Sequence, residues 1–261
     1  MPLVFSPLNE AVLDLPPRRL LPKHAFVMRQ LGEPPAMDVA MADIVTATFK
    51  AQGIQTIDAS DTTVAKDYLE RILGLIRGTG FTVAIFSEQT RSSAMANIAL
   101  ELGFAAMCGK PLMIVKSKEA VAPSDLKRTD WTSYDEADPR PFRRDLRKAL
   151  KEMATLHEYE SALLNVALEA ASPDCAVALE RAIKGFLLSG DRSFISSAER
   201  LLEVLDRVDD GQTIGDLDRL RTETRTFIRQ AAAALGPGRA TPKKKGRAKP
   251  KAPAALEGDR A

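Results

Sequence analysis

The stretch NIALELGFA at residues 97–105, followed by GKPLMIV at 109–115, decides the fold of this chain. In a helix, Asn97 and Glu101 project from the same face because they lie four residues apart. The second stretch opens with a glycine that ends the helix and continues as an apolar run typical of a buried strand. The run FTVAIF at 81–86 predicts the strand before it. Glu101 is therefore expected on a helix that follows the carboxyl end of a parallel strand, where open α/β sheets bind ligands.

Strand and helix patterns alternate on both sides of this stretch, from His24 to Met153. Alternation of this kind indicates a doubly wound parallel sheet with right-handed crossovers. We expect a flavodoxin-like α/β domain over 24–153 with strand order 2-1-3-4-5, which brings the loops after the first and third strands together. The predicted strands are 25–28, 54–57, 81–86, 112–115 and 130–134, and the predicted helices include 37–50 and 139–153.

The region 156–235 has no strand pattern and is rich in Ala, Leu, Glu and Arg, which favour helix. It predicts a small all-α domain that could serve as an oligomerisation element. Short breaks divide it into four helical stretches, at 156–171, 174–188, 192–208 and 214–235.

The last segment, 236–261, is basic. From Arg239 onward it has eight Lys or Arg residues against Glu257 and Asp259, and its one large apolar residue is Leu256. Such a segment cannot bury enough surface to offset its ordering entropy, so we expect it to be disordered. It could contact nucleic acid, but a solubilising tail is the favoured interpretation because no aromatic residue is interleaved to stack on bases.

The composition is that of an ordinary globular protein, with 45% hydrophobic and 28% charged residues among 261. No apolar run reaches the roughly 18 residues of a membrane span, so we expect no membrane partner. Asn9, Glu10 and Asp14 interrupt any signal-peptide core, and two cysteines indicate neither a disulfide scaffold nor a metal site. These features predict a cytoplasmic protein without a bound metal. The absence of a dinucleotide-binding glycine fingerprint and of a Walker loop argues against a Rossmann dehydrogenase or an ATPase.

The pattern Asn-x-x-x-Glu-Leu-Gly-x-Ala, followed by Gly-Lys-Pro and an apolar strand, resembles that of TIR-like and nucleoside 2-deoxyribosyltransferase-like domains. The loop at 123–128 and Tyr134-Asp135 fit the same group, and the resemblance covers about residues 24–153. It implies that Glu101 works at the anomeric carbon of a ribose, as nucleophile or as the charge that stabilises an oxocarbenium-like centre. Asn97 would be its hydrogen-bond partner or would bind a ribose hydroxyl. The alternative is that Glu101 is only a solvated charge on a helix.

Further candidate ligand contacts come from the ends of two predicted strands. The residues at the end of the first strand could face a phosphate or a base edge. The residues of the loop after the third strand could bind an anion at a helix N-terminus. Deoxyribosyltransferase-like members tend to carry an aspartate in the second loop, where this chain has Ser-Glu-Gln at 87–89, which argues against the transferase reaction. The candidates are Arg29 and Gln30, and Ser87, Glu88, Arg91, Ser92 and Ser93.

The resemblance therefore predicts a nucleotide-binding TIR-like protein that hydrolyses the N-glycosidic bond of NAD or a related nucleotide. NAD would be a substrate, and no separate cofactor is expected. A non-catalytic module of the same fold that senses a nucleotide signal is the alternative. A third hypothesis is an interaction protein whose basic tail binds nucleic acid.

Overall fold

A computed structural model describes residues 16–60, 68–121, 131–170, 174–207 and 214–236. Its five strands form a single sheet in which every neighbouring pair is parallel, in the order β2-β1-β3-β4-β5. Both the flavodoxin-like fold and the predicted strand order are thus confirmed. The strands are β1 (Leu21–Met28), β2 (Gln55–Ile57), β3 (Thr79–Phe86), β4 (Leu112–Ser117) and β5 (Trp131–Tyr134).

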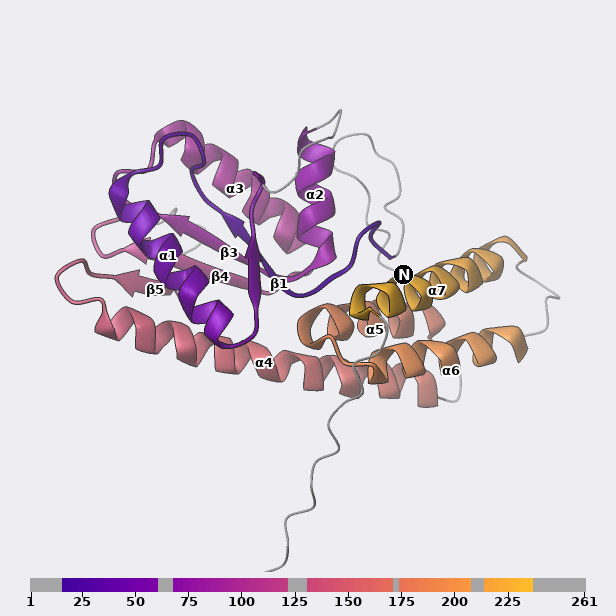
Figure 1. Ribbon diagram of the computed structural model, residues 1–261. Coiled ribbons are helices and arrows are strands. Elements are labelled where there is room, and N and C mark those ends of the chain that lie inside the picture. The colour runs from indigo at the N-terminus through magenta and orange to yellow at the C-terminus, as the bar shows by residue number, and fades with distance from the viewer. Residues whose placement is uncertain (1–15, 61–67, 122–130, 171–173, 208–213, 237–261) are drawn as a thin grey trace, which may run out of the picture.

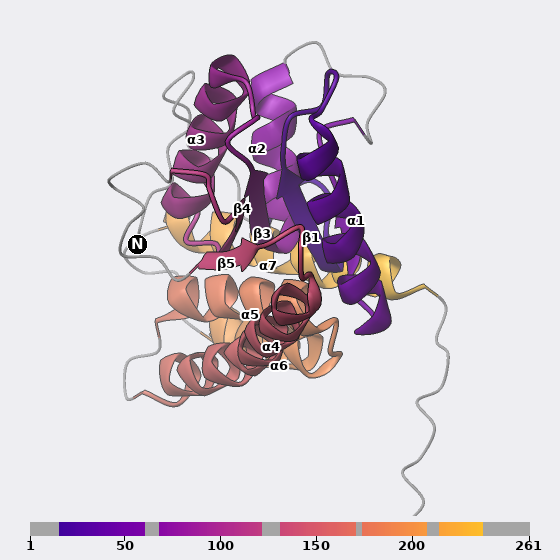
Figure 2. The same ribbon diagram turned by 90° about the vertical axis from the view of Figure 1, so that its left-hand side faces the viewer.

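Helices cover both faces of this sheet, as Figures 1 and 2 show. On one side α1 (Ala36–Ala51) and the first half of α4 (Arg140–Glu169) pack on Val83 and Ile85 of β3. On the other side α2 (Tyr68–Gly78) and α3 (Ser92–Met107) pack on Ala84 and Phe86. Every residue of β3 is buried, because alternate side chains enter two different cores.

The second half of α4 forms a bundle with α5 (Cys175–Ser189), α6 (Ser193–Arg207) and α7 (Ile214–Leu235). Its core includes an edge-to-face pair, Phe186 with Phe227, whose ring centroids lie 5.8 Å apart. The bundle packs against the amino end of the sheet, where a Cβ on Gly80 would lie 2.7 Å from the carbonyl oxygen of Leu187. The opposite end of the sheet, where ligands bind in this fold, stays uncovered by the bundle.

Two sequence predictions differ from the structure. The helices expected at 139–153 and 156–171 are one helix of 30 residues, α4, because the junction at 153–156 contains neither glycine nor proline to stop it. The division into domains at 153–156 therefore passes through a continuous helix. The first strand begins at Leu21, before residue 24, and a bulge separates its two paired segments.

The basic tail and the loop at 123–128 lie outside the described residues, so the predictions made for them stay predictions. None of the helices in the described ranges is both long and apolar enough to cross a membrane.

Candidate functional site

A cavity of about 250 Å³ lies at the carboxyl ends of β1 and β3, between the loop after β1, the start of α2 and the first turns of α3. This is the point where the strand order reverses, and so where the loops after the first and third strands were predicted to meet. Six of the nine predicted site residues line it, namely Arg29, Gln30, Arg91, Ser93, Asn97 and Glu101.

Gln30 joins the two loops. Its buried amide nitrogen donates to the carbonyl oxygens of Gly32 and Glu33, at 3.0 and 2.6 Å, and its amide oxygen accepts from the backbone N–H of Arg91 at 3.0 Å. The Arg91 guanidinium also donates to the Gly32 carbonyl oxygen. Gln30 thus orders the rim of the cavity, a role that differs from the base-edge contact expected for it. The loop after β3 is also held by a hydrogen bond from Thr90 Oγ1 to Oδ2 of buried Asp38, at 2.7 Å.

Arg29 lies at the cavity wall in an ion pair with Asp58, which follows β2. Two guanidinium nitrogens lie 2.8 and 3.1 Å from the same carboxylate oxygen. Burial raises the pKa of Asp58, but hydrogen bonds from Ser60 and Arg29 outweigh it, so the net pKa is lowered. Asp58 is therefore ionised at neutral pH and holds the Arg29 side chain in place.

Glu101 is the most perturbed carboxyl group of the cavity. Burial first, and then the negative charge of Asp58, raise the pKa of Glu101 from 4.5 to about 7. No hydrogen bond or ion pair to Glu101 is found within the described ranges. A carboxylate kept partly dry and without a partner is poised to interact with positive charge that develops beside it.

The remaining predicted residues are placed differently. Asn97 lines the cavity beside Glu101 and is exposed, but no hydrogen bond joins the two among the described residues. Ser87 is buried and serves the turn at 87–90, where its N–H donates to Thr90 Oγ1 at 2.8 Å. Glu88 points to β4, where it accepts from Ser117 Oγ at 2.5 Å. Ser92 begins α3, is exposed and does not line the cavity.

Two further residues belong to the site. Tyr68, at the start of α2, lines the cavity and its pKa is raised by burial and then by the charge of Glu101. Asp58 acts on Glu101 through its charge. Both follow the second strand in the chain, and β2 lies next to β1, so its carboxyl end adjoins the cavity. Their position after that strand is the signal in the sequence that points to the site.

A second cavity, of about 310 Å³, lies on the other side of Arg29, between α1 and β2. Val27 and Arg29 line both cavities, and the second is otherwise polar, with Asp43, Thr46 and Thr56 in its wall. The Arg29–Asp58 pair therefore separates two adjacent hollows at the same edge of the sheet.

Comparison of the chain with protein-family models, with curated proteins and with solved structures gives no match. Within the described ranges, no group of three or more His, Cys, Asp or Glu residues could hold a metal ion.

The perturbed carboxyl group gives a stability prediction. The pKa of Glu101 is raised in the folded state, so its protonated form favours folding, and this contribution is lost as the pH rises through about 7. We expect Glu101→Gln to be more stable than the wild type at pH 8 but nearly equal to it at pH 4.5. The whole pKa shift corresponds to about 3 kcal/mol; because part of the carboxylate reaches solvent, we expect a gain of about 1–2 kcal/mol.

Denaturant unfolding of both proteins at the two pH values measures this gain. Glu199→Gln is the matched control, since Glu199 is an exposed helical carboxylate whose replacement should change stability by less than about 0.5 kcal/mol. A Glu101→Gln difference that is the same at both pH values would show that the carboxylate is well solvated.

Proposed function

We propose that this chain binds a nucleotide in the Glu101 cavity and hydrolyses its N-glycosidic bond, with NAD or a related pyridinium nucleotide as substrate. The observation that carries the proposal is the partly buried, unpartnered Glu101 carboxylate in a cavity at the switch point of a doubly wound sheet. The resemblance to TIR-like domains agrees with this assignment but supports it only through the residues of α3.

The charged groups of the cavity favour a pyridinium leaving group. In NAD the nicotinamide nitrogen bonded to the ribose is positively charged, so when the C1′–N bond breaks, the electron pair leaves with a neutral nicotinamide and no proton is needed. Positive charge then moves onto the ribosyl ring, and Glu101 would stabilise it. Water adds to C1′ and releases one proton. A neutral purine nucleoside would instead require a general acid at its base.

The other cavity residues are assigned to positioning. Glu101 and Asn97 lie on the same face of α3, so a ribose at Glu101 would lie within reach of the Asn97 amide. The Arg29 guanidinium, between the two hollows, is the cation that a diphosphate would face. One nucleoside would then occupy each hollow, since about 250 Å³ is below the usual size of a site for a whole drug-sized ligand.

The test is to incubate the full chain with NAD, NADH and adenosine and to measure the released base by chromatography over a range of protein concentrations. Release of nicotinamide from NAD, with none of the corresponding base from NADH or adenosine, is the expected result. NADH is a close control because its dihydropyridine nitrogen is uncharged.

Binding of NAD without release at any protein concentration would favour the alternative, a nucleotide-sensing module of the same fold. If the chain neither binds NAD nor releases nicotinamide from it, both functions are contradicted.

A further inference from the structure

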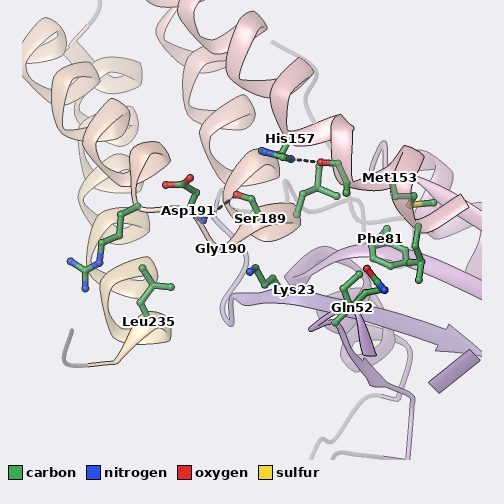
Figure 3. A pocket seen from close by; sticks show the side chains of 14 residues that line it. Lys23, Gln52, Phe81, Met153, His157, Ser189, Gly190, Asp191 and Leu235 are labelled. Carbon is green, nitrogen blue, oxygen red and sulfur yellow. Dashed lines mark hydrogen bonds between the residues drawn. The ribbon is translucent and has the colours of Figure 1, made fainter. Parts of the chain in front are cut away.

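Another cavity lies away from the Glu101 site, between the amino end of the sheet and the helical bundle. It has a volume of about 760 Å³ and is shown in Figure 3. Its walls come from β1, β3, the end of α1, the middle of α4, the turn between α5 and α6 and the end of α7. This size is within the range of sites that enclose a drug-sized molecule.

One part of the wall is apolar. The apolar side chains of this part come from both the sheet and the bundle, so a bound apolar group would contact the sheet and the bundle at once. They are Ile54, Phe81, Leu150, Met153, Leu188 and Leu235.

The polar part of the wall includes Lys23, whose backbone has φ 57°, in the left-handed region that side chains other than glycine seldom adopt. This conformation falls at the bulge in β1. It brings the Lys23 side chain towards the α5–α6 turn, where a Cβ on Gly190 would lie 3.6 Å from Lys23 Cε, and Figure 3 shows it reaching in that direction. Within the described ranges the Lys23 ammonium has no hydrogen-bond or ion-pair partner.

His157 on α4 adds a second polar group. Its Nδ1 donates to the carbonyl oxygen of Ala154, drawn as a dashed line in Figure 3, so Nε2 of the neutral ring can only accept a hydrogen bond. By contrast, Asp191 and Ser189 are already engaged. The Asp191 carboxylate accepts from the N–H of Ser193 at the start of α6, and Ser189 Oγ accepts from the N–H of Asp191.

The charges of the wall therefore favour an anion. Lys23 and Arg192 bring two positive charges, and the one carboxylate, on Asp191, already accepts a helix-capping bond. We propose that this cavity binds a small amphipathic carboxylic acid, with its apolar body on the Phe81 side and its carboxylate at Lys23. The site is separate from the proposed nucleotide site, and its test does not depend on activity.

Octanoate is the probe, octanamide its uncharged isostere, and acetate the head group alone. Binding to the full chain is measured by titration calorimetry and by the change in Tm. We expect octanoate to bind more tightly than octanamide, acetate to show no measurable binding, and octanoate at a hundred times its Kd to raise Tm by on the order of 5 °C. Lys23→Met should weaken octanoate about tenfold and leave octanamide unchanged, because a charge-assisted hydrogen bond is lost.

Two further variants complete the experiment. Lys50→Met removes an exposed lysine outside the cavity and should leave octanoate binding unchanged. Ala154→Trp fills the cavity from an exposed position of α4 and should abolish it. Equal affinity for octanoate and octanamide, or full octanoate affinity in Lys23→Met, would overturn the assignment of the carboxylate. Octanoate binding that is retained in Ala154→Trp would overturn the assignment of the binding site to this cavity.

Discussion

Replacing Glu101 with Gln is expected to lower the rate of nicotinamide release from NAD by about a hundred- to a thousand-fold. The substitution keeps the size and polarity of the side chain but removes the charge that would stabilise an oxocarbenium-like centre. Loss of electrostatic stabilisation of this kind costs about 2.7–4 kcal/mol in the transition state. The affinity for NAD should change much less, because this interaction is made mainly in the transition state. Steady-state kinetics together with a binding titration separate the two effects.

Glu199→Gln is again the matched control, as the same chemical change on an exposed helix outside the cavity. It should release nicotinamide at the wild-type rate. Unchanged turnover in Glu101→Gln would remove this carboxylate from the reaction, and an equal loss in both variants would point to an effect of net charge or handling.

Replacing Phe227 with Ala is expected to give the largest loss of stability. Its side chain is fully buried and meets Phe186 edge to face, which links α7 to α5 in the centre of the bundle. Removing a buried phenyl ring loses its transfer free energy and leaves a cavity, typically costing about 3–5 kcal/mol. Since α5 packs directly on β1 and β3, the sheet should lose support as well. Urea unfolding gives the change in free energy.

Tyr159→Ala is the control, because Tyr159 is an aromatic residue that is 60% exposed on α4. This substitution should change the free energy of unfolding by less than about 0.5 kcal/mol, as for ordinary surface changes. If Phe227→Ala cost no more than Tyr159→Ala, the bundle would not have the packed core described above.

The sheet could be predicted because its central strands are buried on both faces. The apolar runs at 81–86 and 112–115 have the length of buried strands, and alternation with helices then indicates parallel pairing. The early start of β1 could not be predicted, since Pro22 and Lys23 interrupt the apolar pattern at a bulge. The packing of the bundle on the sheet was also beyond prediction, because it depends on a close backbone approach at Gly80 that no periodicity reveals.

The place of the candidate site in the fold could be predicted, but the contacts that each side chain makes there could not. Glu101, Asn97 and Arg29 line the same cavity because fold topology determines where the ends of β1 and β3 lie. The internal role of Ser87 and the loop-ordering role of Gln30 depend on which backbone groups need partners in the folded loops. Sequence position does not contain that information.

The pH dependence of nicotinamide release by the wild-type chain is the most direct test of the central claim that ionised Glu101 drives N-glycosidic cleavage. Because the pKa of Glu101 is raised to about 7, the reactive ionised form is scarce in acid. We expect kcat/KM for NAD to rise about tenfold per pH unit below pH 7 and to level off above it. Measured from pH 5 to 9 in a range where the protein stays folded, a flat profile, a profile that falls as the pH rises, or no release at any pH would contradict the claim.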